Sequence, residues 1–248
     1  MEVHHHAHTS RKKWTHYFWE FLMLFLAVFC GFLAENKREH IVEHKRAKVY
    51  ATNLYQELQK DTAAIGYLIR WTDTLIHKFD TLSEIVQHQP RVTNGKLYFF
   101  AAYTGWARYF SSESSTMEQL KNSGNLRIMT TEIALKISEY ERRIKGLEND
   151  YSLFKIEYET MLGLRLKIFD GVTSVNLFTD YRNARFRDSA FALEPALVNN
   201  DPRLMKEFIG WVKLEADFWE SNISQHLEPM KKTASEIIEM LKKEYHLK

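Results

Sequence analysis

The chain has 248 residues, of which 45% are hydrophobic and 27% are charged, so it can bury a core and is not disordered by composition. Its 34 basic and 32 acidic residues leave a formal net charge of +2, which gives no global field to attract nucleic acid. Only nine glycines and four prolines are present, and so few breakers favour long helices over a β fold with many turns.

The first thirteen residues form a basic tail that is rich in histidine. Four imidazoles occupy five positions, at His4, His5, His6 and His8. Because imidazole binds zinc, copper and nickel, these histidines are a candidate metal site. No cysteine or carboxylate cluster completes such a site, and the alternative is a tail whose histidines gain positive charge at low pH or beside acidic lipid. No other cofactor is expected.

An apolar segment follows the tail. Residues 21–34 read FLMLFLAVFCGFLA and carry no charge, but fourteen residues are short for a bilayer. Adding residues 14–20, with aromatic side chains suited to a membrane interface, gives a helix of roughly 31 Å, enough to cross about 30 Å of hydrocarbon. The sequence therefore predicts a transmembrane helix over 14–34.

A cleaved signal peptide is the main rival to this interpretation. A signal peptide needs small residues before the cut, but Phe32 and Leu33 precede Ala34. A lipoprotein cut before Cys30 would also need a small residue where Phe29 stands. Cys30 is the only cysteine in the chain, so no internal disulfide can form. We therefore expect an uncleaved anchor.

The charges that flank the anchor bear on its orientation. Three basic residues precede it at positions 11–13, and five follow it between positions 37 and 48. A raw count would place the large domain in the cytoplasm. Long domains cross membranes largely regardless of charge, however, and the preceding cluster is dense and has only Glu2 as a distant acid. We expect a cytoplasmic N-terminus and a periplasmic C-terminal domain.

One stripe of the predicted anchor contains His16, Glu20, Ala27 and Gly31. Ala27 and Gly31 are small residues four apart, a spacing that lets two membrane helices approach closely. A carboxyl group at membrane depth usually faces a partner helix or a wet cavity, and His16 could share a proton with Glu20. Alternatively, Glu20 lies shallow enough to reach the headgroups or to pair with Lys13.

Residues 35–88 contain one breaker, Gly66, and their apolar residues recur at steps of three, four and seven. This pattern predicts one long amphipathic helix or two shorter ones. Near the start, HIVEH at positions 40–44 matches the spacing of inverted zinc peptidases. Its surroundings mix opposite charges as a solvated stalk does, and no third ligand can be read, so we do not predict a peptidase.

The middle of the chain begins with a turn at 89–96, which contains Pro, Asn and Gly. Residues 97–110 (LYFFAAYTGWARYF) are apolar nearly all round but too short to cross a membrane, so we expect a central buried helix. Ser115 or Thr116 can then cap a short helix that ends at Gly124.

The last third of the chain contains two further long helical patterns. The first covers 126–169, and we expect the segment 170–201 after it to be irregular. Asn200 or Asp201 can cap the second, which runs to about Tyr245 and is predicted to kink or break at Pro229.

These elements predict an all-α protein. A transmembrane helix at 14–34 would lead, through a stalk, into a helical soluble domain at 35–248. The domain would be an elongated antiparallel bundle of about four long helices that pack as in a coiled coil.

Three stretches resemble a known group of proteins when they occur in order. They are EVHHHAH, WTHYFWEFLMLFLAVFCGFLAENKREH and TMEQLKNSGNLRIM. Together they resemble an uncharacterised family of single-pass membrane proteins from Gram-negative bacteria. The resemblance implies a place in the bacterial inner membrane, and it implies no activity and no catalytic residues.

The sequence favours a non-enzymatic interaction or scaffold protein that forms an oligomer or binds another membrane protein. No recognised motif assembles a nucleophile, a base or a phosphate-binding loop. One alternative is an ion-coupled accessory subunit of a membrane complex that uses Glu20. Another is an extracytoplasmic helical sensor whose output passes through a partner. We expect the anchor to lie in a lipid bilayer, and we do not expect nucleic acid as a partner.

Overall fold

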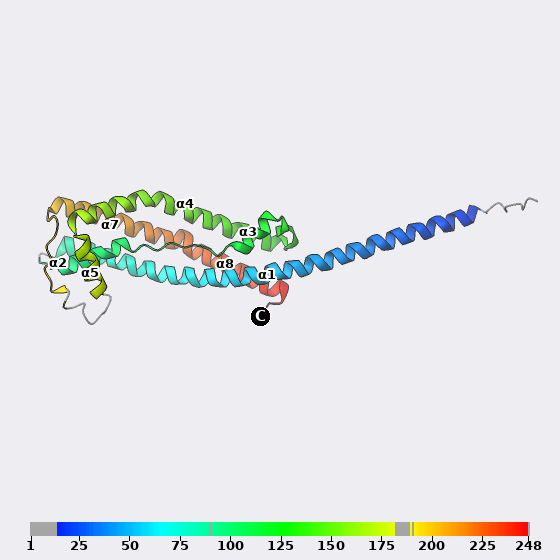
Figure 1. Ribbon diagram of the computed structural model, residues 1–248, viewed down its shortest axis with the longest axis horizontal. Helices are drawn as coiled ribbons and strands as arrows, with labels where there is room; N and C mark the ends of the chain where they lie inside the picture. The colour runs from blue at the N-terminus through cyan, green and yellow to red at the C-terminus, as the bar shows by residue number, and fades with distance from the viewer. Residues whose placement is uncertain (1–13, 90, 182–188, 190, 248) are drawn as a thin grey trace, which may run out of the picture. The chain divides into compact units, whose positions relative to one another are not determined.

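The computed structural model describes residues 14–89, 91–181, 189 and 191–247. Helices and short irregular segments account for all of these residues, and none lies in a strand, which confirms the prediction of an all-α protein. The chain divides into an N-terminal unit, Met1–Tyr50, and a C-terminal unit, Ala51–Lys248. The first helix contributes residues to both units (Figure 1).

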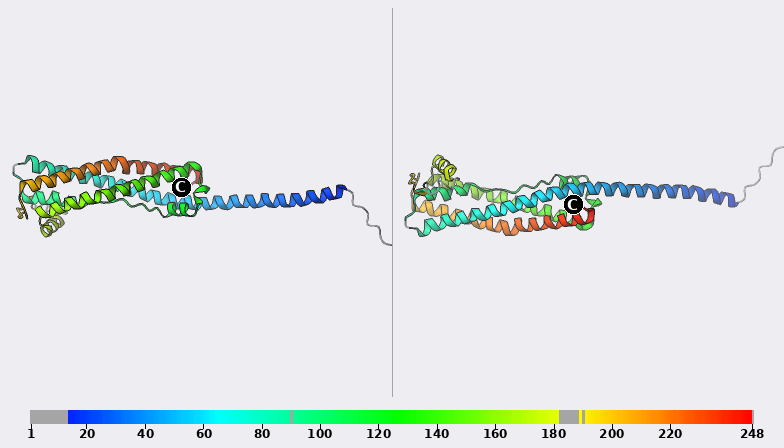
Figure 2. Two further views of the ribbon diagram at one scale, coloured as in Figure 1. Left: turned by 90° about the horizontal axis from the view of Figure 1, so that it is seen from above. Right: turned by 90° about the horizontal axis from the view of Figure 1, so that it is seen from below.

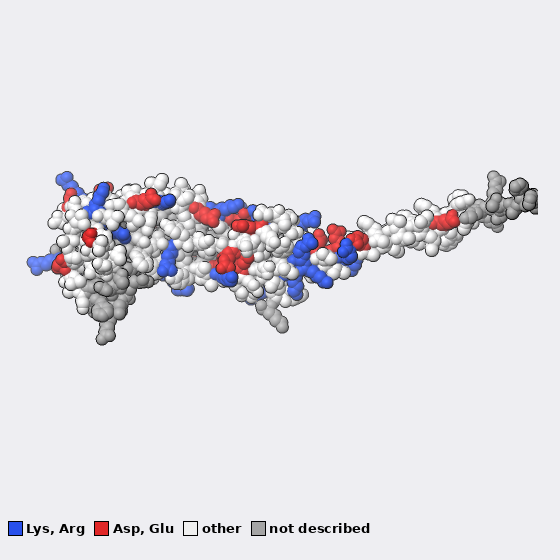
Figure 3. Space-filling model, viewed as in Figure 1, with Lys and Arg blue, Asp and Glu red and all other residues white. Residues whose placement is uncertain are grey.

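The first helix, α1, spans Trp14–His88 without interruption, so the pattern at 35–88 belongs to one helix rather than two. Between positions 21 and 34 almost every side chain is exposed, including Phe25 and Phe29, which stack on each other with centroids 5.9 Å apart. This stretch shows as an uncoloured, charge-free surface in Figure 3. Among the described helices, α1 alone contains a segment long and apolar enough to cross a membrane.

The C-terminal unit is built from the second part of α1 and six shorter helices of the described chain. Their bounds are α2 (Asn94–Ala102), α3 (Ser115–Asn122), α4 (Thr131–Ile168), α5 (Gly171–Tyr181), α7 (Pro202–Asn222) and α8 (Glu228–Tyr245). The predicted cap of α7 is confirmed, because the Asp201 carboxylate accepts a hydrogen bond from the Arg203 amide at 2.8 Å.

Two expectations for the middle of the chain were confirmed only in part. The helix expected over 97–110 ends at Ala102, and residues 106–114 are irregular. Tertiary contacts with α1 replace helical hydrogen bonds there: the Trp71 indole donates to the Trp106 carbonyl at 3.2 Å, and the Arg108 guanidinium stacks 4.5 Å from the Trp71 ring. Local composition favoured a helix, and packing overrode it.

The start of the segment 170–201 is also more regular than expected, since α5 begins at Gly171. Asp170 organises this helix end. Its carboxylate accepts from the Thr173 amide at 2.7 Å, and its carbonyl accepts from the Ser174 amide at 2.9 Å. The first bond satisfies an amide that would otherwise lack a partner in the first turn, and the second is the first backbone hydrogen bond of the helix.

The core of the C-terminal unit is dominated by aromatic side chains. In both views of Figure 2, α4 lies alongside α7 and α8, and the second part of α1 lies next to them. Phe154 of α4 stacks face to face on Phe218 of α7 with centroids 3.9 Å apart, and Trp219 packs edge-on against Phe154. Phe79 from α1 and Phe208 from α7 are fully buried in the same cluster.

A π-helical turn at Ile223–Leu227 separates α7 from α8. Pro229 follows it and has no amide hydrogen to give to the carbonyl four residues earlier, so regular α-helical bonding cannot continue through this point. The expected interruption near Pro229 is therefore confirmed. His226 lies in the turn, and its Nε2 is 2.7 Å from an Asp150 carboxylate oxygen, which ties the turn to α4.

Replacing a core aromatic residue of α7 is expected to destabilise the C-terminal unit. Phe208→Ala should lower the free energy of unfolding by about 3 to 5 kcal/mol, because it removes a fully buried ring and leaves a cavity. Leu214→Ala on the same helix is the matched control, since Leu214 is 53% exposed, and we expect a change within about 0.5 kcal/mol. Urea denaturation of the full chain in non-ionic detergent, followed by circular dichroism, would measure both. Equal effects would contradict the assigned core.

Candidate functional site

The polar pair predicted in the anchor is present in the N-terminal unit. His16 Nε2 lies 3.2 Å from Glu20 Oε1, and both side chains are about half exposed. The small residues Ala27 and Gly31 are exposed, and a Cβ added at Gly31 would meet no atom within 4 Å. The structure thus brings His16 and Glu20 together and leaves the surface around Gly31 open.

The predicted metal ligands His4, His5, His6 and His8 lie outside the described residues. Within the described part of the chain, no group of three or more His, Cys, Asp or Glu side chains could hold a metal ion. The pattern at positions 40–44 therefore gains no third ligand from the fold.

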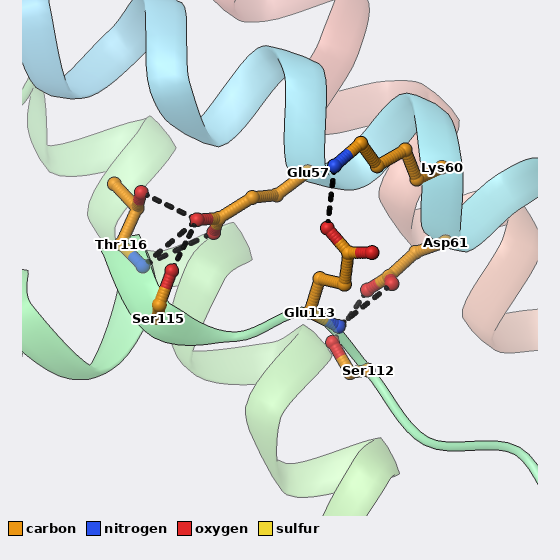
Figure 4. Close-up of polar contacts among 7 residues, drawn as sticks. All are labelled: Glu57, Lys60, Asp61, Ser112, Glu113, Ser115 and Thr116. Atoms are coloured by element: carbon orange, nitrogen blue, oxygen red, sulfur yellow. Dashed lines mark hydrogen bonds and ion pairs between the residues drawn. The ribbon is translucent and has the colours of Figure 1, made fainter.

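A buried carboxylate joins three segments of the C-terminal unit, and Figure 4 shows its contacts with residues 112 and 113. Asp61 of α1 is 3% exposed and accepts a hydrogen bond from the Ser112 hydroxyl, one from the Glu113 amide at 3.0 Å and one from the Tyr140 hydroxyl at 2.8 Å. Burial, followed by the adjacent Asp61 charge, raises the pKa of the Tyr140 phenol far above its ordinary value, so Tyr140 remains a donor.

Glu57, one helical turn before Asp61, caps a different helix. Its carboxylate accepts from the Ser115 hydroxyl at 2.6 Å, the Thr116 hydroxyl at 2.7 Å and the Thr116 amide at 3.1 Å (Figure 4). A negative group at this position satisfies an amide at the start of α3 and complements the helix dipole. Lys60 adds an ion pair to Glu113 at 2.7 Å. These bonds link α1 to residues 112–116, so they hold the irregular segment in place.

A second buried carboxylate is satisfied only in part. Glu215 of α7 is 2% exposed, and its Oε1 accepts a hydrogen bond from the Trp219 indole at 3.3 Å. Its Oε2 has no hydrogen-bond partner in the described structure. Burial raises the pKa of the Glu215 carboxyl to about 8, against the opposing effects of the Trp219 bond and the Arg165 charge. Glu215 is therefore mainly protonated at neutral pH.

Arg165 and Tyr158, both on α4, interact electrostatically with the Glu215 carboxyl. Burial lowers the pKa of Arg165, and its Nε has no hydrogen-bond partner among the described residues. Burial, and then the Glu215 charge, raises the pKa of the Tyr158 phenol to about 12. Glycine at position 105 leaves room for the Arg165 side chain, because a Cβ there would lie 2.7 Å from Arg165 Nη1. The cluster can hold or release a proton in a dry site, and it contains no nucleophile beside a base.

Sequence reasoning missed this cluster, although a signal was present. Glu215 falls on the same face of α7 as Phe208, Val212 and Trp219, all of which are buried. A charged residue within an apolar stripe is a candidate for a perturbed pKa. The identity of its neighbours could not be read, because Arg165 lies fifty residues earlier in the chain and only the fold brings the two together.

Comparisons with models of known families, with curated proteins and with solved structures found no match for this chain. The class that its own features define is an all-α protein with one long, exposed, apolar segment near the N-terminus.

The stability of the C-terminal unit is expected to fall as pH rises from about 4.5 to about 8. Unfolded chains release the Glu215 proton near its usual pKa of 4.5, whereas the folded protein holds it to about 8. Between these values the folded state binds more protons, so the free energy of unfolding should decrease by up to about 5 kcal/mol. Glu215→Gln should abolish this decrease, as measured by urea denaturation at pH 5, 6, 7 and 8.

The exposed Glu220 on the same helix provides the control for this experiment. Glu220→Gln should retain the pH dependence of the unmodified protein. A Glu215→Gln variant that loses stability between pH 5 and 8 as steeply as the unmodified protein would contradict the raised pKa.

Proposed function

We propose that this protein is a non-enzymatic, single-pass membrane protein that holds a helical interaction domain at the surface of the bacterial inner membrane. The observation that carries this proposal is the exposed apolar stretch of α1 between positions 14 and 34. A buried core helix could be equally apolar, but none of the apolar window is buried in the described structure. An exposed apolar surface of this size needs lipid or another apolar surface to cover it.

The flanking residues support insertion across the bilayer. Trp14 and Trp19 are 81% and 61% exposed, at the end of the segment where aromatic rings commonly meet lipid headgroups. The backbone of the segment is fully helical, so its amides and carbonyls are satisfied without water. We propose that the basic cluster before Trp14 stays in the cytoplasm, so that the C-terminal unit lies in the periplasm.

An interaction role suits the polar chemistry of the C-terminal unit better than catalysis does. The carboxylates of Asp61 and Glu57 are committed to hydrogen bonds that hold the fold together. Glu215 is buried and has no adjacent nucleophile. The open surface at Ala27 and Gly31 supports close packing of the anchor on a second copy or on another membrane helix.

The pair of His16 and Glu20 favours one alternative, an ion-coupled accessory subunit of a membrane complex. A carboxylate beside an imidazole at 3.2 Å, near the end of a membrane segment, is a chemically reasonable stop for a moving proton. A sensor is the remaining alternative, and it requires a ligand site in the C-terminal unit.

Membrane crossing and orientation can be measured with a single-cysteine strategy. In a Cys30→Ser background, Ser10→Cys and Ser235→Cys place one thiol before and one far after the anchor; Ser235 is exposed on α8. In cells with a permeabilised outer membrane, an impermeant maleimide should label Ser235→Cys and spare Ser10→Cys. The reverse pattern would move the C-terminal unit to the cytoplasm. Release of the protein from membranes by alkaline carbonate would contradict the anchor itself.

The ion-coupling alternative predicts a reactive carboxyl at Glu20. A hydrophobic carbodiimide should modify Glu20 in native membranes, because the reagent attacks a protonated carboxyl in an apolar environment, and Na⁺ or high pH should slow the reaction. Mass spectrometry of the tryptic peptides would detect it, with Glu20→Gln as the unreactive control. Modification that is absent, or that neither pH nor Na⁺ affects, would leave Glu20 as an interfacial residue and remove the alternative.

A further inference from the structure

An apolar groove lies within the C-terminal unit, between the end of α1 and the first turns of α7. It has a volume of about 700 Å³, within the range of roughly 300 to 1,000 Å³ typical of small-molecule sites. Its apolar walls come from Val86 on α1, Leu197 on the preceding segment, and Met205 and Ile209 on α7. Figures 1 and 2 place these parts of α1 and α7 at the same end of the unit.

The wall that precedes α7 is held by hydrogen bonds to other elements. The Val198 amide donates to the Ile168 carbonyl at 2.9 Å, and the Tyr98 hydroxyl donates to the Ala196 carbonyl at 2.9 Å. The residue between these two anchored positions, Leu197, lines the groove. The wall is therefore formed before any ligand binds, which lowers the entropic penalty of binding.

The charge of the groove is entirely positive among the described residues that line it. Lys206 and Lys213 are exposed on α7, and no acidic side chain accompanies them in the lining. Two other surface lysines of this unit, Lys60 and Lys121, have carboxylate partners in Glu113 and Glu141. Lys206 and Lys213 have no ion pair in the described structure. Two ammonium groups beside apolar walls complement an amphiphile with an anionic head.

Gly210 lies between the two lysines and opens the surface to such a head. A Cβ at this position would meet no atom within 4 Å, so the glycine leaves space on the helix surface. Lys206 and Lys213 are seven residues apart on one helix face, a separation of roughly 10 Å along the axis. Flexible lysine side chains can converge from both sides on an anion above Gly210, while the apolar tail lies along Met205 and Ile209.

We propose that this groove binds a long-chain fatty acid, with the carboxylate between Lys206 and Lys213 and the acyl chain along the apolar walls. A single carboxylate head fits the two converging ammonium groups, and a single chain fits a groove of about 700 Å³. The site lies wholly within residues 51–248, so it does not depend on α1 crossing a membrane. A ligand site here would also supply what the sensor alternative lacks.

A photoreactive fatty acid tests the proposal on the full chain in its native membranes. A palmitic acid probe with a diazirine in the chain should crosslink to α7 near Met205 and Ile209, as mapped by mass spectrometry. Unlabelled palmitate should compete for this labelling, and hexadecanol, which has the same chain without the charge, should compete about tenfold less well. Equal competition by hexadecanol would overturn recognition of the carboxylate.

Matched variants separate the groove from general surface labelling. Lys206→Glu with Lys213→Glu should reduce labelling about tenfold or more by reversing the charge, and Gly210→Leu should reduce it by filling the space above the helix. Gly163→Leu is the control for the second change, since Gly163 on α4 also has open space at its Cβ. Lys243→Glu, on α8, is the control for the first.

The labelling experiment tests the groove even if the anchor proposal fails. Thermal unfolding of each variant would confirm that it is folded, and all the substituted positions are exposed on helices. Labelling of α7 that persists in Lys206→Glu with Lys213→Glu, or that is lost equally in Gly163→Leu, would overturn the site. Neither result depends on carbonate extraction or on maleimide labelling of Ser235→Cys. Failure of the fatty acid site can therefore be distinguished from failure of the membrane anchor.

Discussion

The packing of α7 on α4 is the interaction on which the C-terminal unit depends. Phe154 and Phe218 stack at 3.9 Å, and Trp219 closes the contact from the side. This contact fixes the rotation of α7 about its own axis. The rotation in turn buries Glu215, which lies four residues before Trp219, and exposes Lys206 and Lys213 on another face. A different rotation would place the carboxyl in water and the lysines against the core, at a large desolvation penalty.

Two buried carboxylates in this unit show how environment decides the role of one functional group. Asp61 receives three hydrogen bonds from two neighbouring segments, so the protein replaces the water that burial removes. Glu215 receives one, and the nearby Arg165 compensates only in part. Loss of water therefore leaves Asp61 as a link between segments of the fold, whereas it raises the pKa of Glu215.

Two apolar surfaces of this protein suit different surroundings. They are the exposed segment of α1 and the groove beside α7. The segment at 14–34 has apolar side chains around nearly the whole helix, which suits lipid as a solvent. The groove at α7 has apolar walls on one side and lysines at its edge, which suits a single amphiphilic molecule.

The sequence by itself determined the helical class, the apolar segment at 14–34, a helix cap at Asn200 or Asp201 and the interruption near Pro229. Each of these follows from local chemistry: the absence of breakers, an uncharged run, a side-chain acceptor before the first turn, and a missing amide hydrogen. Only the tertiary structure decided that the apolar residues 97–110 divide between a short helix and an irregular segment, because Trp71 on α1 contacts Trp106 and Arg108 in the second half. It alone also brought Arg165 beside Glu215 and the end of α1 beside Lys206. Such pairs are far apart in the chain, and their energies depend on burial that no local pattern records.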